Sequence, residues 1–412
     1  MTAIRVGFSQ VQLDLPTGIP LAKGTGVAEC ERDALYARAA VIEQGEDTAV
    51  ILSCDLYGVT GRFVSDVRRI IKQITRGQIE ELAVMIVATH TPYSPALPKM
   101  FPVGSASSGE AMHMAYDDAG LTHELAEELA AAVVHAWSKR SPTSIKVGSA
   151  SVPAGTTHNR RPWDAYAGDP DRVITTIEFL QDGGERCVLY NFACHPVLQE
   201  LQNCYSADLF GMVASEMETR LGGKVICLPL NGPSGNVNPG PGGSSSEYNQ
   251  EAADYDSQEI VQTVAAGIET ALERGEAIEC NLVRAGVKLV SIPLADPTVV
   301  ERFPHLRFTR DSPNYALNTQ VQVIRLGDVA VVGLPGEPMV SVGQRVKEMA
   351  IQVGFRTVIV AALANDFIGY YFLPESFDTG GPETILCAHR DEGTVILDGV
   401  EQILSKMREC ED

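Results

Sequence analysis

Residues 84–90 of the chain read VMIVATH, five apolar residues followed by a threonine and then by His90. Four further runs have the same form: VLYNFACH ends at His195, VICLPLNG leads to a Gly-rich loop with Asn238, VAVVGLPGE ends at Glu337, and VIVAALAND leads to Asp366 and Tyr370. Short apolar runs bounded by Gly, Pro or small residues are typical of buried strands. Ligands bind outside the carboxyl ends of such strands in open α/β sheets, so we expect the five polar ends to converge on one crevice.

Helical patterns alternate with these strands along the chain. The spacing of apolar residues predicts helices over residues 63–74, 121–137, 207–221, 252–272, 342–353 and 395–407. Strands are predicted in pairs around short turns at 35–41 with 48–54, at 172–180 with 186–193, and at 321–326 with 329–334, and singly at 82–88, 225–230 and 357–363. This alternation predicts an α/β fold, a layered mixed sheet flanked by helices.

Length and composition restrict the class of protein. The 412 residues carry a formal net charge of −21, with 45% hydrophobic and 21% charged residues, which are ordinary values for a folded domain. We find no internal repeat and no long linker, so residues 1–412 are expected to form one domain. The acidic balance and the absence of a basic run argue against nucleic acid as a partner and against an anionic membrane surface. No stretch approaches the length of apolar chain that spans a bilayer.

The nine cysteines predict a reduced, cytoplasmic protein. They are scattered, with no Cys-x-x-Cys pair, which fits neither a disulfide framework nor a Cys-rich zinc site. The N-terminus, MTAIRVGFSQ, lacks the charged and apolar regions of a signal peptide. Homo-oligomers are common among soluble proteins, so a homo-oligomer is the default expectation.

Two histidines and one glutamate at strand ends are a usual zinc set, because neutral imidazoles and one carboxylate leave a position for water or substrate. Each residue also has a simpler interpretation. His90 or His195 could be a hydrogen-bonded structural histidine. Glu337 could cap the helix predicted after it, and Tyr370, beside two other aromatic residues, could be core packing. The residues alone therefore indicate an α/β enzyme, with a metal-dependent hydrolase as one candidate.

Six segments, taken in order, resemble the neutral ceramidase family. They are LYARA at 35–39, ATHT at 88–91, NRxP at 159–162, NGxxGxVxP at 231–239, LPGE at 334–337, and residues 365–370. The resemblance implies a neutral-ceramidase-like catalytic domain that hydrolyses an amide bond with one zinc ion. Carried over by motif, it implies that His90, His195, Glu337 and Tyr370 bind Zn²⁺ and that Arg160 faces the substrate.

The chain departs from the family pattern at three places. Asn238 stands where the family has a serine, and asparagine can donate a hydrogen bond but cannot act as a nucleophile. Pro92 replaces the second histidine of the family's Thr-His-Thr-His motif. The chain ends soon after residue 400, so we expect neither the family's C-terminal β-sandwich domain nor its secretion signal. The resemblance is therefore to short, single-domain members.

These features predict a zinc hydrolase that cleaves an amide or a lactone/ester bond in a small polar substrate, with metal-bound water as the nucleophile. Arg160 and Asn238 would hold the substrate or stabilise the developing oxyanion. His158, Asn231 and Trp163 are the predicted substrate-binding residues. Two alternatives stay open: a metal-dependent isomerase or lyase acting on a polar, sugar-acid-like metabolite, and a non-catalytic binding relative.

Overall fold

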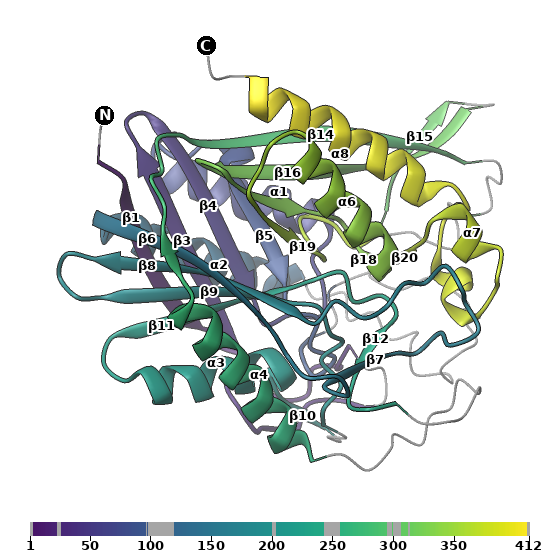
Figure 1. Cartoon of the computed structure of the whole chain (residues 1–412), viewed down its shortest axis with the longest axis horizontal. Coiled ribbons are helices and arrows are strands. Elements are labelled where there is room, and N and C mark those ends of the chain that lie inside the picture. The colour runs from purple at the N-terminus through teal and green to yellow at the C-terminus, as the bar shows by residue number, and fades with distance from the viewer. Residues whose placement is uncertain are drawn as a thin grey trace.

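The structure, a computed structural model, describes residues 3–22, 26–95, 97, 119–199, 203–242, 256–294, 299, 306–311 and 314–409 (Figure 1). Its larger sheet has the strand order β11 (Val225–Asn231), β9 (Arg186–Phe192), β8 (Val173–Gln181), β6 (Ser141–Ser151), β1 (Arg5–Gln12), β3 (Tyr36–Gln44), β4 (Asp47–Cys54), β5 (Val84–Ala88), with β13 (Glu276–Ala277) paired to β6. The smaller sheet has the order β14 (Val283–Leu294), β16 (Asn314–Leu326), β17 (Val329–Gly333), β19 (Thr357–Ala361), with β15 (Arg307–Asp311) paired to β16. Both sheets are mixed, because β4 with β5, β9 with β11, and β17 with β19 run parallel.

Helices cover the outer face of each sheet. The helices over the larger sheet are α1 (Gly61–Ile74), α2 (Ala119–Ser138), α3 (Asp208–Leu221) and α4 (Ser257–Glu273), and those over the smaller sheet are α6 (Val340–Gln352) and α8 (Glu392–Glu409). The remaining described elements are short. Three are helical turns: η1 (Glu81–Ala83), α7 (Pro374–Phe377) and η3 (Pro382–Leu386). The others are three pairs of strands: β2 (Cys30–Glu31) with β10 (Cys204–Tyr205), β7 (Thr157–Asn159) with β12 (Val237–Pro239), and β18 (Glu337–Pro338) with β20 (Tyr370–Tyr371).

The two sheets pack face to face, which explains why their strands are apolar on both sides. Successive residues of a strand point to opposite faces. In β9, Cys187 and Leu189 enter the core between the sheets, whereas Val188 and Tyr190 pack under α3 and α4. The core between the sheets also contains Ile324 and other buried apolar residues of the smaller sheet. The order of layers is helices, larger sheet, smaller sheet, helices.

The larger sheet curls, so that its two edge strands meet. Ser53 of β4 donates a hydrogen bond to the carbonyl oxygen of Pro229 in β11 at 2.6 Å. Asn231, the last residue of β11, donates to the carbonyl oxygen of Thr89 just after β5 at 3.3 Å. The smaller sheet joins the same place, because the Ala362 amide donates to the Asn231 carbonyl oxygen at 2.9 Å. The carboxyl ends of β5, β9, β11, β17 and β19 are thereby brought together.

The predicted fold class is confirmed, and so are the helices and strand pairs expected from the sequence. The helix predicted over 252–272 begins at Ser257 in the described residues, and 252–255 lie outside them. Besides the short strands, three long strands were not predicted: β1, β6 and β14. Their sequences, RVGFSQVQ, SPTSIKVGSAS and VRAGVKLVSIPL, interrupt the apolar pattern with polar and small residues, and neighbouring strands decide their pairing.

The expectation that every cysteine is reduced was wrong for one pair. Cys30 and Cys204 form a disulfide across the parallel pair β2 and β10, although 174 residues separate them. Sequence spacing could not reveal this contact, because it depends on two short strands that meet only in the folded chain. Free thiols are present at Cys54, Cys187, Cys194, Cys227, Cys280 and Cys387. None of the described helices is long and apolar enough to cross a membrane.

Candidate metal centre

His90 follows β5 and is held by the turn after β4. Its amide donates to the carbonyl oxygen of Leu56 at 2.9 Å, and its ring Nδ1 lies 2.6 Å from the carbonyl oxygen of Tyr57. The Tyr57 ring packs on the imidazole, with 4.2 Å between ring centroids. His90 has a φ of 76°, which a non-glycine residue adopts only when its surroundings enforce it. The backbone therefore fixes both the position and the direction of this side chain.

His195 lies three residues beyond β9 and faces the Gly-rich loop. Its amide donates to the carbonyl oxygen of Val237 at 2.9 Å, and its Nδ1 lies 2.7 Å from the carbonyl oxygen of Ser234. The loop is itself anchored, because the Gly235 amide donates to the carbonyl oxygen of Pro338 at 2.9 Å. The last residues of the predicted loop, 243–246, lie outside the described residues.

Glu337 and Tyr370 are neighbours because β18 and β20 form a parallel pair in which these two residues are in register. The Glu337 amide donates to the carbonyl oxygen of Gly369 at 2.8 Å. Glu337 does not cap the helix that follows it. Helix α6 begins three residues later, and its first amide, that of Val340, donates to the Asn236 side chain at 2.9 Å.

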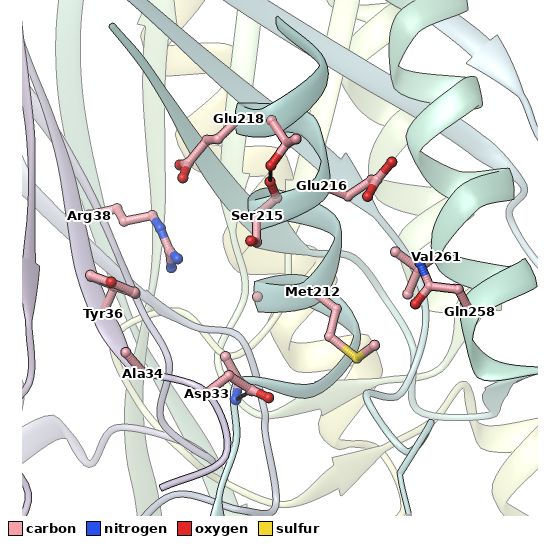
Figure 2. Close-up of a pocket in the computed structure, with 13 residues that line it drawn as sticks. Asp33, Ala34, Tyr36, Arg38, Met212, Ser215, Glu216, Glu218, Gln258 and Val261 are labelled. Atoms are coloured by element: carbon pink, nitrogen blue, oxygen red, sulfur yellow. Dashed lines mark hydrogen bonds between the residues drawn. The ribbon is translucent and has the colours of Figure 1, made fainter. Parts of the chain in front are cut away.

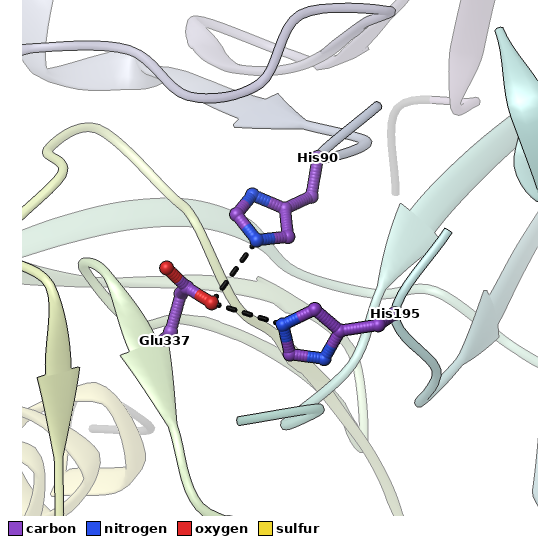
Figure 3. Close-up of side chains that lie close together, drawn as sticks. All are labelled: His90, His195 and Glu337. Carbon is purple, nitrogen blue, oxygen red and sulfur yellow. Dashed lines mark hydrogen bonds and ion pairs between the residues drawn. The ribbon is translucent and has the colours of Figure 1, made fainter. Parts of the chain in front are cut away.

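Three of the predicted ligands meet in one buried cluster (Figure 3). The Nε2 atoms of His90 and His195 lie 3.0 and 3.1 Å from the same carboxylate oxygen, Oε2 of Glu337. The three donor atoms lie within 4.8 Å of one another. All three side chains are at least nine-tenths buried. This is the spacing at which one cation can touch two imidazoles and a carboxylate.

The hydrogen bonds of the two Nδ1 atoms determine the tautomers of His90 and His195, and hence whether Nε2 presents a lone pair to the cluster. A carbonyl oxygen only accepts, so Nδ1 of each histidine carries the hydrogen that it donates to Tyr57 or Ser234. In a neutral ring Nε2 is then an acceptor, as Glu337 Oε2 is. Burial, followed by the charge of Arg160, lowers the pKa of His195 and so favours its neutral form. Acceptor atoms thus converge where a positive charge is needed.

The carboxylate of Glu337 is ionised in this cluster. Burial alone would raise its pKa, but when His90 and His195 are protonated, their charges and the hydrogen bonds that they donate outweigh burial, so that its pKa falls far below the ordinary value. A buried carboxylate requires compensating positive charge. The lowered pKa therefore indicates a site that supports a cation or protonated imidazoles.

Tyr370 lies beside the cluster, with its hydroxyl 3.3 Å from Nε2 of His195. Burial raises the pKa of this phenol well above its usual value, although the Arg160 guanidinium opposes the shift. Arg160 stacks over the Tyr370 ring at 5.3 Å from the ring centroid. The four predicted ligands therefore lie close together, and Arg160, the predicted substrate-facing arginine, packs against Tyr370.

Arg160 is fixed by groups on two sides. Its Nη2 donates to the carbonyl oxygen of Gly235 at 2.7 Å, and its Nε lies 3.2 Å from Oε1 of Glu383. The other oxygen of Glu383 pairs with the fully buried Arg161 at 2.6 Å. Glu383 therefore forms ion pairs with two arginines, and it holds the Arg160 guanidinium over Tyr370.

Asn238 and His158 are paired residues of β12 and β7. Asn238 follows Val237, whose carbonyl oxygen contacts His195, and its own Oδ1 is buried and makes no hydrogen bond within the described residues. His158 contacts the carbonyl oxygen of Gly240 through Nδ1 at 3.0 Å. The buried Oδ1 of Asn238 lacks a hydrogen-bond donor among the described residues, and a ligand bound beside the histidine cluster could supply one.

The other predicted residues take different positions. Asn231 is fully buried and bonded to the Thr89 carbonyl oxygen, so it braces the strand that carries His90. Trp163 is 39% exposed and lies against Arg161, with the guanidinium carbon 5.3 Å from the centroid of its ring. The Asp366 carboxylate accepts from the Gly61 amide and the Thr319 hydroxyl and therefore holds a turn together.

Sequence reasoning missed three residues that build the site: Tyr57, which orients His90, Asn236, which caps α6, and Glu383, which positions Arg160. Asn236 lies within the Gly-rich motif, so that motif could have pointed to it. Tyr57 acts through its backbone carbonyl, and Glu383 belongs to no motif, so neither carries a signal in the sequence.

Comparisons with known proteins place this geometry in a structural context. No protein-family model matches the chain, and no curated protein matches it. Among solved structures, the neutral ceramidase from Pseudomonas aeruginosa matches with a TM-score of 0.79 and 15% sequence identity, over 99% of this chain and 75% of that one. A ceramidase complexed with C2 matches with a TM-score of 0.78 and 14% identity, over 99% of this chain and 76% of that one. The resemblance inferred from six short motifs is thus confirmed at the level of the fold: the chain has the fold of the neutral ceramidases.

Proposed function

We propose that residues 1–412 act as one catalytic domain, a zinc-dependent hydrolase that cleaves an amide or a lactone/ester bond in a small polar substrate. The ligands of the zinc ion would be His90, His195, Glu337 and Tyr370. The proposal combines the geometry of the cluster with the fold that the chain shares with two ceramidases.

One observation carries the proposal: both histidines donate through Nδ1 to backbone carbonyls and turn Nε2 toward the same glutamate oxygen. Metal-binding histidines are oriented in this way, since a hydrogen bond from the outer nitrogen fixes the tautomer that ligates. Two imidazoles and one carboxylate form a three-ligand set of the kind found in catalytic zinc sites. A purely structural cluster would pair donors with acceptors instead of turning acceptors toward one another.

When bound, zinc would supply Lewis acidity and lower the pKa of water at its open position. The chain's own residues would do the remaining work. Arg160, held by Gly235 and Glu383 over Tyr370, would hold a substrate oxygen at a fixed guanidinium. The Nδ2 group of Asn238 would donate a hydrogen bond to the developing oxyanion. Its Oδ1, which has no partner among the described residues, would accept a hydrogen bond from the substrate. The Tyr370 phenol stays protonated in the absence of a cation, because burial raises its pKa.

Elemental analysis of protein purified without a metal-binding tag tests the metal centre. We expect about one equivalent of zinc in the natural chain and a loss of metal in His195→Ala and in Glu337→Gln. The control is His135→Ala, which removes an exposed histidine of α2 and should leave the metal content unchanged. Metal that persists in both site variants, or its absence from the natural chain after purification with zinc, contradicts the proposal.

Products then distinguish hydrolysis from the alternative reactions. Amides and lactones of small polar acids are incubated with the zinc-loaded protein, and the products are analysed by mass spectrometry. The expected result is the addition of one water, which gives two fragments from an amide and one ring-opened acid from a lactone. These products should form with the natural chain and be lost in Glu337→Gln. One rearranged product of unchanged mass would indicate an isomerase, and unchanged turnover after removal of the metal would exclude a metal hydrolase.

A further inference from the structure

A pocket lies between the start of β3 and helices α3 and α4 (Figure 2). Its volume is about 410 Å³. None of the four predicted metal ligands lines it. Ala34, Ala207 and Gly211 form part of its wall, and their small side chains leave the space open. A cavity of this size accommodates a small metabolite.

A buried arginine forms one side of the pocket. Arg38 is 3% exposed, stacks at 4.8 Å over the Tyr36 ring, and donates from Nη1 to Asp55 at 2.8 Å. Its Nε is buried and donates to no acceptor in the described part of the chain. Because a guanidinium has five N–H donors, Arg38 retains hydrogen-bonding capacity for an acceptor in the pocket.

A carboxylate on α3 faces the same space. Glu218 and Arg38 both line the pocket, and in Figure 2 the Glu218 carboxylate extends from the helix to the side on which Arg38 lies. Glu218 accepts a hydrogen bond from the Cys227 amide at 2.9 Å, and it forms no ion pair with Arg38 or with any other described residue. Burial raises the pKa of Glu218, although the hydrogen bond from the Cys227 amide and the charge of Arg38 oppose the shift.

The other charges at this pocket are already paired. Asp33 lies 3.7 Å from Arg32, and Glu216 lies 2.8 Å from Arg220. Arg38 itself is balanced by Asp55. Glu218 is therefore the lining carboxylate without an ion-pair partner among the described residues, and a ligand with one positive charge would compensate it.

We propose that this pocket binds a small organic cation in which an ammonium group stands beside an oxygen acceptor, as in an amino sugar or an amino alcohol. The ammonium group bonds to Glu218, and the neighbouring oxygen accepts from Arg38. The net negative charge of the lining side chains disfavours simple carboxylates. The site is independent of the metal centre, and its occupancy does not require hydrolysis.

Titration calorimetry at neutral pH with four probes tests the chemistry of the ligand. Glucosamine is compared with glucose, which lacks the ammonium group, and ethanolamine with ethylamine, which lacks the oxygen. We expect the probe with both groups to bind more tightly than its partner in each pair. Equal binding within both pairs, or no heat from any probe, overturns the proposal.

Two variants test the location. Glu218→Gln keeps an oxygen for the Cys227 amide but removes the charge, and should weaken glucosamine binding about tenfold, as expected for loss of a charge-assisted hydrogen bond. Ser215→Tyr, at an exposed position on the pocket wall, should abolish binding by filling the space. Glu273→Gln is the matched control, an exposed residue of α4 outside the pocket. Affinity that both pocket variants retain places the ligand elsewhere and refutes the assignment.

Discussion

Replacing Glu392 by glutamine should make the protein less sensitive to rising pH. Glu392 is the first residue of α8 and is completely buried. Its Oε2 accepts from the amides of Ala388 and His389 at 3.1 and 3.3 Å, whereas its Oε1 has no hydrogen-bond partner among the described residues. Burial raises the pKa of this carboxyl from 4.5 to about 8, although these hydrogen bonds oppose the shift.

The direction in which stability changes with pH follows from proton linkage. The folded state binds the Glu392 proton more tightly than the unfolded state, so this group contributes its full stability below pH 4.5 and loses it as pH rises to about 8. Each pH unit in that window corresponds to about 1.4 kcal/mol, which gives about 5 kcal/mol over the whole window. Domains are stable by only about 5–15 kcal/mol, so the effect is large.

Urea unfolding at several pH values between about 5 and 9 measures the effect. Glu392→Gln keeps an oxygen acceptor for the two amides and does not titrate. Its stability relative to the natural chain should therefore increase by about 1.4 kcal/mol per pH unit and level off above about pH 8. Glu401→Gln, the same change at an exposed position of α8, is the control and should follow the natural chain. Parallel stability curves for Glu392→Gln and the natural chain would refute the reasoning.

Three further predictions concern the site and its support. Asn236→Ala removes the acceptor for the first amide of α6 and should lower the free energy of unfolding by about 1–2 kcal/mol, measured by urea unfolding. Asn238→Ala should reduce kcat about 10²–10³-fold with the zinc content unchanged, since an oxyanion donor has about that effect, and an unaltered kcat would remove it from the reaction. Gly393→Ala should prevent the docking of α8, because the added Cβ would lie 2.0 Å from the carbonyl oxygen of Phe372; a natural near-ultraviolet circular dichroism spectrum and melting temperature would contradict this.

The sequence by itself determined which segments form the layers and which residues end the strands. Apolar runs such as 84–88 and 187–190 are buried on both faces, and this burial explains why the pattern is continuous instead of alternating. Polar residues placed just after these runs mark the carboxyl edge of each strand. His90, His195 and Glu337 could be singled out for this reason, since their chemistry and their strand-end positions are both visible in the chain.

Only the tertiary structure decided which strand ends meet and how each side chain is turned. The larger sheet curls until β11 reaches β5, a contact set by hydrogen bonds between residues far apart in sequence. The backbone carbonyls of Tyr57 and Ser234 select the histidine tautomers, and Glu383 holds Arg160, although none of these partners lies in a local motif with the group that it orients. The residue type supplies the chemistry of a ligand, but its direction depends on distant backbone atoms that no local pattern encodes.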